Sequence, residues 1–183
     1  MVINDMSVKV IDNYLKEEDF RAITSIVLSN KFSWAFGVVL HQHVNDVLVE
    51  EKDNFQFEHL LFNTSPPIIN IGKPFTFFHS EALECIKPLL DNLPVRALIR
   101  AKFNLNPRTS INLEHGYHTD FLYPESTTSV FYLNTNNGYT KFEDGTKVES
   151  VANRLVTFPS NTPHTGSTCT DEKRRVVLNL NYF

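Results

Sequence analysis

The second half of the chain alternates apolar and polar side chains in the manner of β-strands. Over residues 97–105, one face would carry only small and apolar side chains and the other would carry Arg100, Lys102 and Asn104. Further strands are expected at 129–134, 139–143, 147–151, 154–158 and 175–183. Turn residues separate several of them, as at Asn136-Asn137-Gly138 and Asp144-Gly145. This unbroken series of short strands predicts an antiparallel β sandwich or barrel.

The first half carries helical signals. Residues 16–29 show an apolar stripe at helical spacing with acidic residues in the first turn, which favours a helix. Ser80 is a good N-cap for a second helix through about residue 91, which Pro88 would kink or shorten. Residues 8–11 and 31–40 are expected to be strands, and 41–79 give no clear prediction. We therefore expect N-terminal helices packed on one sheet of a mostly β (α+β) fold.

The last strand has two different faces. One face would be apolar, with Val176, Leu178, Leu180 and Tyr182. The other would begin with Arg175 and continue through Val177, Asn179 and Asn181. An arginine turned into a polar cavity can bind a carboxylate through two parallel hydrogen bonds. Arg174 is the rival for this role, but its face is apolar, so we favour Arg175.

A small group of residues has the composition of a metal site. His118-Thr119-Asp120 and the distant His164 offer two imidazoles and one carboxylate, the ligand set of a non-haem Fe(II) facial triad. His118 and Asp120 are two positions apart, so their side chains would share one face of a strand. His164, from a distant loop, would complete the set and leave three metal positions open. A His-x-Asp pair alone arises often by chance. The evidence for a metal site is that this pair is followed in order by His164 and the basic strand.

The second half of the chain, about residues 97–183, resembles the Fe(II)/2-oxoglutarate-dependent oxygenases, specifically the prolyl 4-hydroxylase-like branch. Four blocks match in order: His118–Asp120, Ser129–Asn134, Asn137–Gly145 and Asn153–Pro159, which leads to His164 and the basic strand. The third block departs from the family, because the usual Gly-Gly is Asn137-Gly138 here. The resemblance implies a double-stranded β-helix, or jelly-roll, core at 96–183 with a helical support region at 1–95, within one domain.

The resemblance also implies roles for individual residues. His118, Asp120 and His164 would bind Fe(II), Arg175 would pair with the distal carboxylate of 2-oxoglutarate, and Tyr132 would donate a hydrogen bond to that carboxylate. The implied reaction uses O₂ to hydroxylate a C–H bond, with release of succinate and CO₂, and ascorbate would be an accessory reductant. A prolyl residue of a peptide or protein is the default substrate, although related enzymes act on free amino acids, other small molecules and alkylated bases.

Composition narrows the remaining choices. The 183 residues suffice for one domain with a buried core. The net charge of −4 weighs against a nucleic-acid partner held by phosphate contacts. Cys85 and Cys169 make no disulfide framework, and we see neither a signal pattern nor a membrane-spanning run, so a cytoplasmic protein is expected. The pattern does not predict an oligomeric state.

Two other classes of protein stay open. A non-catalytic jelly-roll binding module would keep the fold without turnover. A cupin-like metalloenzyme would use His41 and His43 with Glu50 or Glu51, although the expected Gly-rich flanks are missing and these residues precede the β-rich half. His115 is expected to be a loop histidine that does not share the face of His118.

Overall fold

The described part of the chain consists mostly of strands and has few helices. The computed structural model describes residues 8–37, 39, 43–44, 47–48, 55–65, 76–123 and 125–183. The helices are α1 (Glu17–Val27), the 3₁₀ helix η1 (Glu81–Ile86) and α2 (Lys87–Asn92). The strands are β1 (Lys9–Ile11), β2 (Ala35–Gly37), β3 (His43–Val44), β4 (Val47–Leu48), β5 (Gln56–Ser65), β6 (Thr76–His79), β7 (Leu98–Pro107), β8 (Thr127–Tyr132), β9 (Tyr139–Phe142), β10 (Lys147–Glu149), β11 (Leu155–Pro159), β12 (His164–Gly166) and β13 (Arg174–Tyr182).

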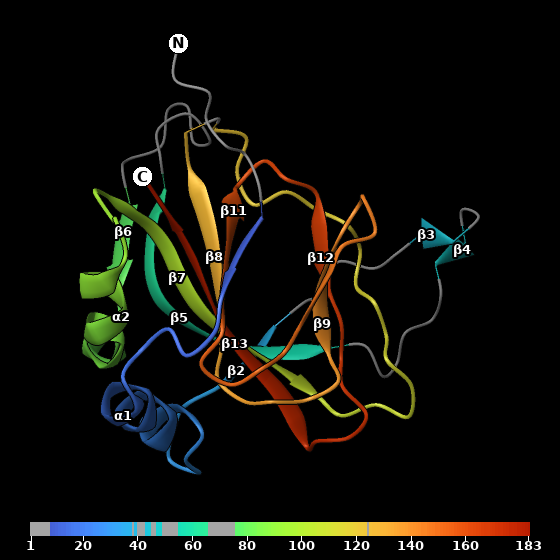
Figure 1. Ribbon diagram of the computed structural model, residues 1–183, viewed down its shortest axis with the longest axis horizontal. Helices are drawn as coiled ribbons and strands as arrows, with labels where there is room; N and C mark the ends of the chain where they lie inside the picture. The colour runs from blue at the N-terminus through green and yellow to red at the C-terminus, as the bar shows by residue number, and fades with distance from the viewer. Residues whose placement is uncertain are drawn as a thin grey trace.

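Two antiparallel sheets make up the framework. The large sheet has the order β1-β11-β8-β13-β7-β5-β2, with β6 pairing on β5, and the small sheet has the order β10-β9-β12. Figure 1 shows α1 and α2 on one side of the large sheet and β9 and β12 on the other. Neighbours such as β8 and β13 are far apart in sequence, as in a jelly-roll, so the mostly β prediction is confirmed.

The two faces of the large sheet bury different side chains. On β7 and β13, Phe103 and Leu178 belong to one apolar cluster that also includes Ile23 of α1 and Ile86 of η1. The opposite face contributes to a second cluster between the sheets, where Val177 packs with residues such as Phe142 and Phe158. The strict alternation along β7 and β13 thus separates an apolar helix-facing side from a side that faces the small sheet.

The N-terminal elements follow their local signals closely. Acidic residues occupy the first turn of α1, which suits the helix dipole. The Ser80 side chain caps η1 by accepting a hydrogen bond from the Ala82 amide, as predicted. The expected helix over 80–91 is divided into η1 and α2, and Pro88 lies in the first turn of α2, where a missing N–H costs nothing. None of the described helices is long and apolar enough to span a membrane.

The sequence did not predict β12 or the strands of the 41–79 segment, which are β3, β4, β5 and β6, and the division into two regions stays a prediction. β5 lies in the segment for which the pattern gave no prediction, and it pairs with β7 at six positions of register that include a bulge between Leu60 and Phe62. β12 begins at His164, where a loop was expected. Because β5 joins the same sheet as β7, residues from both halves of the chain build one face of the cavity described next.

Candidate active site

His118 and His164 are directly opposite each other across a β-bridge. The His118 amide donates to the His164 carbonyl at 3.0 Å, and the His164 amide donates to the His118 carbonyl at 2.9 Å. Residues paired in this way turn their side chains to the same face, and the two imidazole centroids are 4.6 Å apart. The bridge replaces the expected strand, because Asp120 lies in a bend anchored by its amide to the Ser160 carbonyl at 3.0 Å.

Backbone carbonyls fix which nitrogen of each imidazole is available. His118 Nδ1 lies 3.2 Å from the Gly116 carbonyl, and His164 Nδ1 lies 2.9 Å from the Thr162 carbonyl. A carbonyl oxygen only accepts, so Nδ1 donates in both rings and Nε2 is left with its lone pair. Burial holds the pKa of His164 below its ordinary value, against the opposing effect of Asp120. The ring is therefore neutral at physiological pH, as a metal ligand must be.

Hydrogen bonds hold the Asp120 carboxylate from three sides. Arg100 Nη2 donates to Oδ1 at 2.5 Å, while Thr128 Oγ1 and Asn181 Nδ2 donate to Oδ2 at 2.9 and 3.0 Å. Burial alone would raise the pKa of Asp120, but Arg100, the nearby His164 and the two Oδ2 donors outweigh it, so the pKa is lowered. The group is thus ionised and fixed in orientation.

His118, Asp120 and His164 together fit a metal ion. Each offers one ligand atom, and these atoms all lie within 4.8 Å of one another. The distance from His164 Nε2 to Asp120 Oδ2 is 3.9 Å. Two imidazole nitrogens and one carboxylate on one side of a cavity match the facial set that binds Fe(II) and leaves further positions open. The structure brings the three residues together, and metal binding itself stays a prediction.

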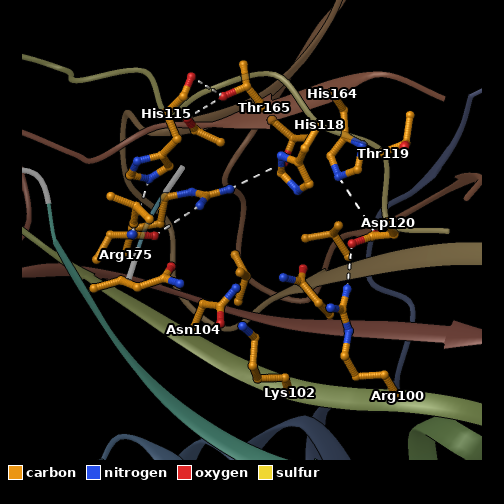
Figure 2. Close-up of a pocket in the computed structure, with 18 residues that line it drawn as sticks. Arg100, Lys102, Asn104, His115, His118, Thr119, Asp120, His164, Thr165 and Arg175 are labelled. Atoms are coloured by element: carbon orange, nitrogen blue, oxygen red, sulfur yellow. Dashed lines mark hydrogen bonds and ion pairs between the residues drawn. The ribbon is translucent and has the colours of Figure 1, made fainter. Parts of the chain in front are cut away.

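The metal-ligand cluster opens into a cavity of about 330 Å³ between the two sheets. That volume lies within the range of small-molecule sites. Figure 2 shows Arg175 on one side of this cavity and Asp120 on the other, with the side chains of Arg100, Lys102 and Asn104 along its floor. These three residues come from alternate positions of β7, so their predicted common face does line the cavity.

Arg175 is a buried cation without an acidic partner. Its side chain is 3% exposed, and it donates to Ser150 Oγ at 2.8 Å and more weakly to Thr140 Oγ1 at 3.3 Å. Among the residues that the structure describes, no carboxylate lies within ion-pair distance of it. Burial lowers the pKa of Arg175 from its high ordinary value, but an arginine stays charged. A buried, uncompensated guanidinium facing a cavity is suited to bind an anionic ligand.

The two other residues considered for cosubstrate binding lie outside this cavity. Arg174 turns to the opposite side of the sheet, where its Nη2 donates to the Leu28 carbonyl at 2.6 Å. The Tyr132 hydroxyl donates to Thr140 Oγ1 at 2.8 Å, and its ring lies against the Arg175 guanidinium at 5.6 Å from centroid to Cζ. Tyr132 therefore packs against Arg175 and does not line the cavity. A hydrogen bond from Tyr132 to the cosubstrate stays a prediction.

His115, Thr140 and Asn106 also line the cavity, and the sequence gave no direct sign of them. His115 does lie in a loop, as expected, but it is 8% exposed, faces the cavity, and has its Nε2 3.3 Å from Asn106 Nδ2. The period-two argument failed because the residues before His118 form no strand. For Thr140, the alternation of the predicted strand 139–143 could have indicated an inward position.

The alternative metal set near the N-terminus lies mostly outside the described residues. His41, Glu50 and Glu51 lie outside the described residues, and only the backbone of His43, in β3, is described. Within the described part of the chain, His118, Asp120 and His164 are the one group with the spacing of a metal site.

The chain matches no protein-family model and no curated protein. Solved structures do match. A prolyl-4-hydroxylase from Pseudomonas putida aligns with a TM-score of 0.59 and 16% identity, over 98% of this chain and 92% of that one. A prolyl hydroxylase from Trichoplax adhaerens, in complex with a peptide fragment of the hypoxia inducible factor oxygen degradation domain, aligns with a TM-score of 0.57 and 16% identity, over 99% and 85%. An oxidoreductase of the 2OG-Fe(II) oxygenase family from Burkholderia pseudomallei aligns with a TM-score of 0.65 and 9% identity, over 98% and 87%.

These alignments cover nearly the whole chain, so the fold is the one shared by 2-oxoglutarate/Fe(II) oxygenases and prolyl hydroxylases. The resemblance inferred from the sequence is confirmed at the level of the fold. Because one fold can host different activities, the activity has to be argued from the site.

Proposed function

We propose that this protein is an Fe(II)- and 2-oxoglutarate-dependent dioxygenase that hydroxylates a C–H bond and releases succinate and CO₂. One observation carries the proposal: a His-Asp-His cluster and a buried arginine, which has no acidic partner among the described residues, face the same cavity of about 330 Å³. Either feature alone has structural explanations. Together they provide for a divalent metal and for an anionic cosubstrate at one place.

The residues of the chain have separate tasks in this proposal. His118, Asp120 and His164 would hold Fe(II), which when bound supplies the activation of O₂ for C–H oxidation. Arg175 would bind the distal carboxylate of 2-oxoglutarate, and its bond to Ser150 fixes its orientation. Its burial keeps water away from this contact and so strengthens it.

The default substrate is a prolyl residue in a peptide or protein. Support comes from two of the structural neighbours, which are prolyl hydroxylases, one of them in complex with a peptide. At 16% identity this support concerns the shape of the fold and not the residues that would contact a substrate. A small-molecule substrate therefore stays part of the proposal. We also propose that the protein is cytoplasmic.

The test begins with binding in the absence of O₂. Adding 2-oxoglutarate to the Fe(II)-loaded protein should produce a weak metal-to-ligand absorption band, and admission of O₂ should yield succinate. Asp120→Ala should abolish the band and the succinate. Arg175→Ala should weaken 2-oxoglutarate binding and leave iron affinity nearly unchanged, while Arg174→Ala is the matched control, because Arg174 faces the other side of the sheet.

The other classes of protein predict different outcomes. A non-catalytic binding module would give neither the band nor succinate. A cupin-like site would keep its metal in Asp120→Ala and lose it in His43→Ala. Either result would overturn the proposed function.

A further inference from the structure

Two cations line the cavity in addition to Arg175, and the proposed function assigns neither of them to a ligand. Arg100 and Lys102 project from alternate positions of β7 into the cavity floor (Figure 2). The Arg100 side chain is 25% exposed and that of Lys102 is 18% exposed, so both retain contact with the cavity space. A cation in such a place needs either an internal partner or an anionic ligand.

The internal partners satisfy these cations unequally. Arg100 donates to Asp120 and, through Nε, to Asn181 Oδ1 at 2.9 Å, so its orientation is fixed. Among the described residues, Lys102 Nζ has one partner, Glu58 Oε2 at 2.7 Å. An ammonium can donate three bonds, which leaves Lys102 able to bind a second oxygen.

Glu58, the partner of Lys102, does not itself line the cavity. Its side chain lies over Gly37 of β2, where an added Cβ would meet Glu58 Cγ and Oε2 at 3.1 Å. Lys102 thus faces the cavity, while the carboxylate that pairs with it does not.

The charges of the described residues leave the loaded cavity positive. Arg100, Lys102 and Arg175 are cationic, whereas only Asp120 and the adjacent Glu58 are anionic. The charges of Fe(II) and of doubly ionised 2-oxoglutarate cancel each other. Loading the site as proposed therefore leaves the described residues around the cavity with one net positive charge.

We propose that this cavity floor binds one negatively charged group of the primary substrate, a carboxylate in the simplest case. The inference rests on the proposed function and narrows its substrate class to carboxylate-bearing molecules, such as a free amino acid, an organic acid or a peptide with an acidic side chain or terminus. Lys102 supplies the open donor, and Arg100 adds positive charge beside it.

The experiment measures binding and not turnover. The protein is loaded with Mn(II) and saturated with 2-oxoglutarate, and the longitudinal relaxation of acetate methyl protons is followed as acetate is added. Acetamide, which has the same shape without the charge, serves as the neutral probe. We expect saturable paramagnetic relaxation for acetate and none for acetamide, because only the anion occupies the floor near the metal.

Three variants separate the ion-binding role from a structural one. Lys102→Gln should weaken acetate binding about tenfold, the loss expected for one charged hydrogen bond. Glu58→Gln should tighten it, because the competing carboxylate is gone. A purely structural ion pair would give the same direction of change in both variants. Lys141→Gln is the matched control, since Lys141 pairs with Glu114 at 2.9 Å in the same way but does not line the cavity.

The result can also contradict the inference. Acetate relaxation that is absent, or that is the same in wild type, Lys102→Gln and Glu58→Gln, would overturn the proposed subsite. A loss of 2-oxoglutarate affinity in Lys102→Gln would assign Lys102 to the cosubstrate and overturn it equally. If the wild-type protein fails to bind Mn(II) and 2-oxoglutarate in the preceding titrations, the proposed function falls, and the subsite falls with it.

Discussion

Replacing Gly138 by alanine tests the role of Arg175 without touching the arginine. A Cβ at Gly138 would lie 2.6 Å from Arg175 Cδ, 2.8 Å from Asn136 Oδ1 and 2.9 Å from the Thr168 carbonyl oxygen. Carbon atoms in proteins do not approach this closely, and one of the contacts is with backbone. Gly138 corresponds to the second glycine of the family's Gly-Gly. This chain retains that glycine, and the packing around it leaves no room for a side chain.

The backbone at Gly138 has little freedom to move away. Its amide donates to Asn136 Oδ1 at 2.9 Å, and its carbonyl accepts from the Ser150 amide at 2.9 Å. Ser150 Oγ in turn accepts from Arg175 Nε, so a shift of this segment also disturbs the guanidinium. Overpacking of this kind costs about 1–3 kcal/mol. Misplacing a charged hydrogen bond costs about 1.5–3 kcal/mol, so the Kd for 2-oxoglutarate should rise roughly tenfold to a hundredfold.

The assay is titration of the anaerobic Fe(II) protein with 2-oxoglutarate, followed through the metal-to-ligand band, with iron affinity and Tm measured in parallel. Gly166→Ala is the matched control, because its Cβ would meet Arg175 Nη1 and His115 Cδ2 at an ordinary 3.5 Å. We expect that control to bind 2-oxoglutarate nearly as the wild type does. A folded Gly138→Ala protein with unchanged affinity for 2-oxoglutarate would refute the assignment of Arg175.

Three further substitutions test the supports of the site and the core. Asn181→Ala removes a donor to Asp120, so Mn(II) affinity should fall about tenfold to a hundredfold in a metal titration, and unchanged affinity would remove Asn181 from the metal support. Asn153 has φ 62°, and its side chain forms hydrogen bonds with both the amide and the carbonyl of Leu15. Asn153→Ala should lower the free energy of unfolding in urea by about 2–4 kcal/mol. Asn153→Gly should lower it less, because glycine accepts this φ. Phe103→Ala should lower the free energy of unfolding by about 3–5 kcal/mol, since the side chain is fully buried, and a loss below about 1 kcal/mol would place it outside the core.

Strands with strict alternation could be predicted from the sequence, and strands without it could not. β7 and β13 bury one face against helices and turn the other toward the small sheet, so their side chains alternate in character. β5 has a bulge between Leu60 and Phe62, which changes the side-chain phase midway and hides the period of two. β12 has three residues, too few for any period to appear.

The same distinction applies to the candidate site. His118 and Asp120 are near each other in sequence, which brings them together without the expected strand, and the parity of β13 separates Arg175 from Arg174. The place of the Tyr132 hydroxyl could not be read from parity, because a correct face does not say how far a long side chain reaches. Tyr132 bonds Thr140 of the opposite sheet, and that contact depends on how the two sheets pack.

The charge of the cavity floor depends on strand register, which no local motif records. Arg100 reaches Asp120 and Asn181 because β7 pairs with β13 so that Arg100 lies opposite Asn181, and Lys102 meets Glu58 because β5 is the other neighbour of β7. A register slip of one residue in β7 would turn both cations toward the helices and leave the metal ligands unchanged. Chains that share the His-x-Asp…His pattern can therefore differ in the charge they present to a substrate, and in this fold the place to look for that difference is the strand that faces the metal ligands across the cavity.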